Sequence, residues 1–211
     1  GALIIGVPLG ILCAIFLAFF GSNRVAKIAK AGVQLLAGIP SVVYGFFGLV
    51  VLVPFIRENF GGTGQSILCA SLVLGIMILP TIITLSESAL KAVPEAYYEG
   101  ALALGADHER SVMRVMLPAA ISGVLASIIL AIGRAIGETM AVIMIAGNQV
   151  QMPDAITDGI RTMTANIVLE MGYAADLHRG ALIGTACVLF VFILIINFAF
   201  SALKKKGRNN G

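Results

Sequence analysis

Two ionisable residues, Arg134 and Glu138, stand inside an otherwise apolar stretch of the sequence. A spacing of four residues places both on one face of an α-helix, about 6 Å apart along its axis. An unpaired charge is costly in hydrocarbon, so both side chains should face a helix bundle or a wet cavity. A guanidinium offers planar donors to phosphate or carboxylate oxygens, which predicts an anion path with Glu138 as partner or gate. The alternative is an ion pair that only locks neighbouring helices.

The amino-acid composition indicates that these charges lie in a membrane protein. The chain has 211 residues, of which 59% are hydrophobic and 12% charged, and its mean hydropathy is +1.00. A water-soluble enzyme of this size could not cover so much apolar surface with so few charges. Disorder is excluded by the same apolar content, and three cysteines are too few for a disulfide scaffold. The sequence therefore predicts an all-α, polytopic membrane protein.

Five charge-poor runs are long enough to cross a bilayer as helices. They cover residues 1–20, 32–56, 66–90, 117–147 and 180–203. The first run has no basic segment before it and no cleavage pattern after it, so we expect a true span rather than a signal peptide. Because it begins directly in apolar sequence, we also expect at least one helix upstream. Residues 1–211 are predicted to form one transmembrane domain.

The basic residues predict the orientation of these spans. Ten of the 14 fall on one side of the predicted membrane, which the positive-inside rule makes the cytoplasmic side. The amino end is therefore expected outside and the carboxyl end in the cytoplasm. The ten are Arg24, Lys27, Lys30, Lys91, Arg110, Arg114, Lys204, Lys205, Lys206 and Arg208.

The longest cytoplasmic connection, residues 91–118, reads as a short helical hairpin. Pro94 suits the start of one helix, Gly105 can turn the chain, and Asp107 is a plausible N-cap for a second helix. Two short helices in this order would form a compact knob that projects from the membrane. The alternative from physical chemistry alone is a connector that lies on the lipid headgroups.

A motif in this hairpin resembles the EAA loop of ABC-importer permeases. That loop has a glycine six residues after its glutamate and an Ile-x-Leu-Pro ending that begins ten residues beyond the glycine, and both spacings hold here. Gly100 replaces the usual alanine and Val115 the usual isoleucine. The matching residues are Glu99, Gly100, Ala101, Gly105, Ala106, Val115, Leu117 and Pro118.

The resemblance implies a five-span permease core whose loop docks in a groove of a separate cytoplasmic ATPase. Glu99 would then make a polar contact with the ATPase, Gly105 would be a turn or close-approach point, and Pro118 would separate knob from span. No Gly-x-x-x-x-Gly-Lys-Ser/Thr pattern occurs. We therefore expect no catalytic residue and no cofactor in this chain, with ATP used by the partner.

Residues 133–142, which contain Arg134 and Glu138, are similar to the fourth-span segment of phosphate-specific permeases, and residues 38–45 resemble the same family. The Glu-Thr-Met-Ala-Val run is closer to its PstC-type than to its PstA-type subunit. This resemblance implies import of inorganic phosphate by alternating access across a bacterial or archaeal cytoplasmic (inner) membrane. The implied partners are a PstA-type sibling permease, a PstB-type ATPase dimer and a PstS-type extracytoplasmic binding protein.

The outer connection, residues 148–179, offers a second candidate surface. Ile156, Ile160, Met163 and Ile167 recur at helical spacing, which predicts an amphipathic helix. It would serve as a docking ledge for the binding protein or pack onto the transmembrane bundle.

Two other functions compete with an ATP-driven importer. An ion-coupled secondary transporter could use Arg134 and Glu138 for its coupling ion, and a membrane scaffold would need neither residue. The three cysteines lie in predicted spans, where they suit packing, and His108 and His178 lie in opposite loops, so no metal site is expected. The modest net charge of +3 gives no sign of nucleic-acid binding.

Overall fold

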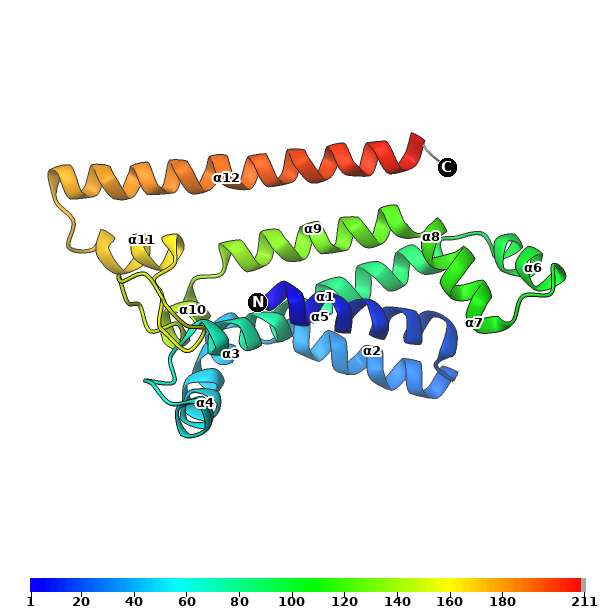
Figure 1. Ribbon diagram of the computed structural model, residues 1–211, viewed down its shortest axis with the longest axis horizontal. Helices are drawn as coiled ribbons and strands as arrows, with labels where there is room; N and C mark the ends of the chain where they lie inside the picture. The colour runs from blue at the N-terminus through cyan, green and yellow to red at the C-terminus, as the bar shows by residue number, and fades with distance from the viewer. Residues whose placement is uncertain (210–211) are drawn as a thin grey trace. The chain divides into compact units, whose positions relative to one another are not determined.

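The computed structural model describes the backbone of residues 1–209 and the side chains of residues 1–199 (Figure 1). Helices make up the regular structure of this part of the chain, with one isolated bridge between Gly147 and Ile160. The basic side chains of residues 204–208 lie outside the described side chains. In chain order the helices, with π-helical segments labelled η, are α1 (Ala2–Ile15), η1 (Phe16–Phe20), α2 (Asn23–Gly38), α3 (Ser41–Phe47), η2 (Gly48–Leu52), α4 (Val53–Phe60), α5 (Ile67–Lys91), α6 (Glu95–Ala103), α7 (His108–Ser111), η3 (Val112–Met116), α8 (Leu117–Ala119), α9 (Ile121–Gly137), α10 (Met140–Ile145), α11 (Met163–Met171) and α12 (Asp176–Asn209).

Among the described residues, four helical segments are long and apolar enough to cross a membrane: Ala2–Phe20, Ser41–Phe60, Ile67–Lys91 and Asp176–Ala199. A helix pair, His108–Ala119 and Ile121–Gly137, passes the same test together but is bent by 67°. The count of up to five spans agrees with the prediction. The orientation across the membrane stays a prediction.

Two predicted spans are wrong in their extent. The second begins at Ser41 rather than near residue 32, because Pro40 has an extended backbone (ψ 144°) and ends the preceding helix, so that α2 is separate. The fourth is not one helix over residues 117–147. It bends at Ala120 and stops at Gly137, and a further short helix, α10, starts at Met140.

The chain divides into two compact units. The first comprises residues 1–5, 39–77 and 133–199, and its core joins α3, α5 and α10. Glycine allows α3 and α10 to approach closely, because a Cβ at Gly45 would lie 2.7 Å from the Cα of Ala141. Cys69 is buried in this core as a packing residue, whereas Cys13 and Cys187 are exposed.

The second unit comprises residues 6–38, 78–132 and, within the described backbone, 200–209. Its core joins α1, α5 and the segment from η3 to α9 through Ala14, Leu90, Val112 and Val124, among others. The hydroxyls of Ser86 in α5 and Ser127 in α9 are 2.8 Å apart and buried. This hydrogen bond satisfies both hydroxyls and links the two helices.

Candidate functional site

The helical hairpin predicted for residues 91–118 is present as α6 and α7 (Figure 1). Pro94 precedes α6 with an extended backbone, and its carbonyl accepts a hydrogen bond from the Tyr97 amide at 3.1 Å. Asp107 caps α7, because its Oδ1 accepts from the Arg110 amide at 2.7 Å. Both helix starts are confirmed.

Gly105 turns the chain at the end of α6. Its φ of +85° lies in the left-handed region that favours glycine. The Gly105 amide donates to the Leu102 carbonyl at 2.9 Å, and the Ala106 amide donates to the Ala101 carbonyl at 3.1 Å. This pair of bonds is a Schellman motif, which satisfies carbonyls at a helix end. Apart from its immediate neighbours along the chain, nothing in the described structure lies within 4 Å of a Cβ placed at Gly105, so the backbone conformation, rather than close packing, favours glycine here.

The hairpin is stabilised from within by an aromatic–imidazole contact that the sequence reading missed. The Tyr98 hydroxyl lies 2.7 Å from Nδ1 of His108, and the Phe20 ring contacts the same imidazole edge-on at 4.8 Å. These contacts join α6 to α7 and both to the end of η1. Tyr98 and His108 are ten residues apart in the sequence, a separation that follows no helical or strand period, so no sequence pattern indicated this contact.

The outer surface of the hairpin combines exposed apolar and charged side chains. Leu104 is 92% exposed at the turn, and Tyr97, Leu102 and Met113 are also exposed. Glu99 is exposed, whereas Ala101 is buried against the rest of the hairpin. Exposed apolar side chains of this size suit contact with another protein or with lipid.

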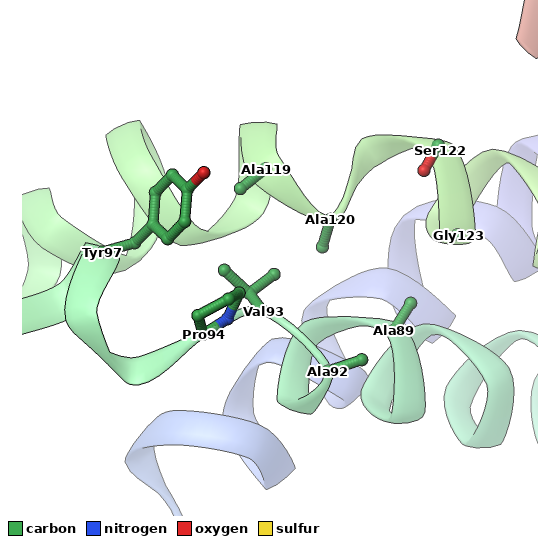
Figure 2. Close-up of a pocket in the computed structure, with 9 residues that line it drawn as sticks. All are labelled: Ala89, Ala92, Val93, Pro94, Tyr97, Ala119, Ala120, Ser122 and Gly123. Carbon is green, nitrogen blue, oxygen red and sulfur yellow. The ribbon is translucent and has the colours of Figure 1, made fainter. Parts of the chain in front are cut away.

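The hairpin meets its span at a bend. Pro118 lies in α8, directly before the 67° bend that separates His108–Ala119 from Ile121–Gly137. Beside the bend is a hollow of about 330 Å³ (Figure 2). Its walls are mostly small residues, including Ala89, Ala119 and Gly123, and Tyr97 stands at its edge (Figure 2).

Arg134 and Glu138 do not share a helix, which corrects the prediction. Arg134 lies in the last turn of α9, where a cation is favoured by the helix dipole. Glu138 follows the end of α9, and its Oε1 accepts from the amides of Thr139 and Ala141, each at 3.2 Å. Glu138 therefore caps α10. In the described part of the chain, no carboxylate lies within salt-bridge distance of Arg134. The positive charge of Arg134 acts electrostatically on the Tyr44 side chain.

The carboxyl end of α10 is capped by donors from other segments of the chain. Four consecutive main-chain oxygens, which a helix end leaves without intrahelical partners, each have a donor. Such donors are needed wherever irregular backbone lies among apolar side chains. The bonds are Asn148 Nδ2 to Ile143 O at 2.7 Å, Gln65 Nε2 to Met144 O at 2.9 Å, Ser66 N to Ile145 O at 3.0 Å and Ile160 N to Ala146 O at 2.8 Å.

The outer connection is mostly irregular rather than helical. The predicted amphipathic helix through residues 156–167 is wrong in its first half, because only α11, Met163–Met171, forms. Asp158 instead binds the amides of Asp154 and Ala155, both at 2.9 Å, and so closes a turn. Thr162 caps α11 by accepting from the Ala165 amide at 3.3 Å.

Arg161 holds this connection together. Its guanidinium donates to Glu170 at 2.7 Å, to Asn166 at 3.3 Å and to the Asn148 carbonyl at 3.1 Å. The ion pair to Glu170 ties the irregular segment to α11. Arg161 is therefore engaged inside its own loop rather than displayed for a partner.

An ionic cluster in the second unit was not recognised from the sequence. Glu87 in α5 lies between Lys30 of α2 and Lys91 at the end of α5, with nitrogen–oxygen distances of 2.6 Å and 2.7 Å. The Glu87–Lys91 half has the spacing of four that favours a helical ion pair, so the sequence held that signal. The Lys30 half depends on tertiary structure. Within the described residues, no group of three or more His, Cys, Asp or Glu is placed to hold a metal.

Comparison with known proteins agrees with this architecture. The chain is 40% identical over 208 residues to the probable ABC transporter permease protein YqgH of Bacillus subtilis (strain 168). The aligned region covers 95% of this chain and 67% of that protein. It is 33% identical over 215 residues to the phosphate transport system permease protein PstC of Haemophilus influenzae. Here the aligned region covers 92% of this chain and 68% of that protein.

Solved structures share the fold. The inward-facing MetNI methionine ABC transporter matches with a TM-score of 0.71 and 22% identity, over 98% of this chain and 87% of that chain. A bacterial ABC transporter that imports the acidic polysaccharide alginate matches with a TM-score of 0.67 and 16% identity, over 95% of this chain and 74% of that chain.

The family model described as binding-protein-dependent transport system inner membrane component matches residues 6–209. Members are transport components of the inner membrane rather than enzymes, and they work with an ATPase, a substrate-binding protein and a sibling permease. With nearly its whole length matched, the chain belongs to this family and is a transmembrane permease subunit of an ABC importer.

Proposed function

We propose that this chain is the PstC-type permease subunit of an importer that moves inorganic phosphate across the inner membrane. Hydrolysis of ATP by a PstB-type ATPase dimer would drive alternating access, and a PstS-type binding protein would deliver phosphate from outside. The names of relatives such as PstC of Haemophilus influenzae support phosphate as the substrate. The name of YqgH gives no substrate, so the substrate must be argued from the site.

The observation that carries the proposal is the free charge of Arg134. Its guanidinium has no carboxylate within salt-bridge distance in the described part of the chain, so its donors remain open to an anion. Phosphate presents several oxygens in a geometry that a guanidinium can bind bidentately. One arginine offsets only part of the charge of phosphate, and we infer that the PstA-type sibling contributes further cations.

Glu138 supports this path as a positioning residue. Because its carboxylate caps α10, it fixes the chain just after Arg134 instead of neutralising the guanidinium. The rival ion-coupled mechanism needs Arg134 and Glu138 to act as a pair, and the break between α9 and α10 separates them.

The hairpin of α6 and α7 is proposed to transmit ATPase motion to the spans. Glu99 and Gly100 lie on its exposed side, Ala101 and Ala106 close the Schellman motif, and Gly105 sets the turn. Leu117 and Pro118 lie where the hairpin joins the bent span. A rigid hairpin with a defined bend at its base can transmit a movement of the ATPase to the membrane-spanning helices.

The test is uptake by the assembled importer in vesicles supplied with phosphate-loaded PstS-type binding protein. We expect Arg134→Gln to lower phosphate uptake about tenfold or more, because a charge-assisted bidentate contact is lost. Arg134→Lys should retain part of the activity. Arg57→Gln removes an exposed arginine that lies outside the proposed path, and it serves as the charge-matched control. Normal phosphate uptake by an assembled Arg134→Gln complex would contradict the proposed path.

The substrate itself is tested by ATPase stimulation. Phosphate-loaded binding protein should raise ATP hydrolysis by the wild-type complex several-fold above the level with empty binding protein. Equal hydrolysis with both would remove phosphate as the substrate while leaving the permease assignment intact.

A further inference from the structure

The cluster of Lys30, Glu87 and Lys91 carries an excess of positive charge. Both ammonium groups lie against the same oxygen, Oε1 of Glu87, whose side chain is only 8% exposed. Two cations therefore share one carboxylate. The hydrogen bond from Lys30 to Glu87 raises the pKa of Lys30 above its usual value, so this ammonium stays charged at neutral pH.

The surrounding helix adds to this excess. α2 contains Arg24 and Lys27 in addition to Lys30 and has no acidic residue. Neither Arg24 nor Lys27 has a carboxylate within salt-bridge distance among the described residues. α2 also exposes Ile28 and Leu35, so it combines basic and apolar side chains on its surface.

An apolar groove adjoins the cluster. It has a volume of about 430 Å³ and lies between α1, α2 and α5. Ala29 and Val33 of α2 border Lys30 on the same helix, and Ile83 of α5 lies one turn before Glu87. The opposite wall is formed by Leu12, Cys13 and Phe16 of α1 and η1, all exposed. The groove is thus open along one wall, and its α2 and α5 walls include residues one to four positions from Lys30 and Glu87 in the sequence.

The position of Lys91 in α5 suits contact with a lipid headgroup. Lys91 is the last residue of Ile67–Lys91, a helix long and apolar enough to cross a membrane, so its ammonium is expected at the membrane surface with Ile83 two turns deeper. The basic residues predict that this is the cytoplasmic surface, where anionic lipids attract lysine and arginine.

We propose that Lys30 and Lys91 bind the phosphate of an anionic phospholipid whose acyl chain occupies the groove of Leu12, Cys13, Phe16, Ala29, Val33 and Ile83. The single negative charge of a phosphatidylglycerol headgroup complements the single excess positive charge of the cluster. A phosphatidylcholine headgroup carries its own cation and offers no such complement. Because α2 has no buried residue and the groove wall of α1 is exposed, an acyl chain can enter from the bilayer.

The test is retention of lipid by the assembled importer, taken from vesicles of equal parts phosphatidylglycerol and phosphatidylcholine and measured by native mass spectrometry. The wild-type complex should retain phosphatidylglycerol selectively. Lys30→Gln should lower this retention about fivefold, because one cation near the surface is lost. Lys30→Arg should keep it, and Arg57→Gln, an equal loss of charge elsewhere, should leave it unchanged.

The groove is tested separately by Ala29→Phe, which fills it while keeping both lysines. This variant should also lose selective retention. Equal behaviour of Lys30→Gln and Arg57→Gln, or full retention by Ala29→Phe, would overturn the proposal. Displacement of the lipid by millimolar inorganic phosphate would assign the lysines to a free anion instead. Cross-linking of Cys13 to the sibling permease would assign the groove to a protein helix.

A further test uses the unmodified complex, so its outcome does not depend on whether the variants fold. The unmodified complex should retain no lipid selectively from vesicles of phosphatidylcholine and phosphatidylethanolamine, which carry no net charge. Selective retention from that mixture would also overturn the proposal. These outcomes are independent of the transported substrate, because each is scored on lipid binding alone.

Discussion

The carboxylate of Glu138 lies 3.2 Å from the backbone nitrogen of Ala141, at the start of α10. This relationship gives Glu138 a structural task that its charge alone did not indicate. Substitution by glutamine keeps an oxygen acceptor, whereas substitution by alanine removes it. We expect Glu138→Ala to lower the free energy of unfolding by about 1 kcal/mol and Glu138→Gln to lower it by less.

The measurement is thermal unfolding of the purified complex, with uptake recorded in parallel. Equal losses of stability in the two variants would show that the charge of Glu138, rather than its cap, matters.

Gly105 and Gly100 form a matched pair for testing the turn of the hairpin. A Cβ would meet no atom within 4 Å at either position, but only Gly105 has a positive φ, +85°. Gly105→Ala should therefore destabilise the hairpin by about 1 kcal/mol, whereas Gly100→Ala should stabilise α6 by up to about 1 kcal/mol. Amide hydrogen exchange across residues 95–111 measures both effects.

Asparagine separates the two roles that Gly105 could have. It tolerates a left-handed backbone, so Gly105→Asn should keep the turn while adding a side chain. If the ATPase approaches this point closely, the variant will assemble but lose ATP-driven uptake. Normal uptake with a retained turn would limit Gly105 to its conformational role.

Arg161 is predicted to stabilise the outer connection. Arg161→Ala removes donors to Glu170, Asn166 and the Asn148 carbonyl, and we expect a loss of about 2 kcal/mol together with faster proteolysis of residues 148–162. Arg179, an exposed arginine near the start of α12, provides the control as Arg179→Ala. Unchanged proteolysis in Arg161→Ala would contradict this role.

A charge reversal at Arg161 is therefore a poor probe of binding-protein docking, because it would break the loop itself. Docking is better tested at Ile156 and Met152, which are exposed in the same connection. Their replacement by aspartate should weaken binding-protein-stimulated ATPase activity if this surface docks, without loss of loop stability.

Close approach of α3 and α10 predicts a strong effect of a single methyl group. Gly45→Ala would place its Cβ 2.7 Å from the backbone of Ala141, so we expect about 1 to 3 kcal/mol of destabilisation. Gly38→Ala meets no atom within 4 Å and should be tolerated. Thermal unfolding of both variants tests the prediction, which fails if they behave alike.

The sequence predicted the parts of the structure that depend on local chemistry. Apolar length located four helical spans and the bent fifth, and Pro94, Gly105 and Asp107 gave the ends of the hairpin helices. It failed where helix continuity was assumed. Gly137 ends α9 and the following Glu138 caps α10, a stop and a start that apolar composition conceals.

The remaining features depend on residues distant in the sequence. Lys30 meets Glu87 from another helix, and Gln65 reaches the Met144 carbonyl across 79 positions. No period or spacing encodes such contacts, because they follow from how helices associate. The spacing of Glu87 and Lys91 could be recognised as a helical ion pair, but nothing in the sequence indicated that Lys30 joins them.

The four capped carbonyls of α10 have a mechanical consequence. Their donors belong to residues 65–66, 148 and 160, so a displacement of α10 alone would strand main-chain oxygens among apolar side chains, each at a cost comparable to a lost hydrogen bond. Residues 140–145 are thus expected to travel through the transport cycle as one body with the segments that cap them.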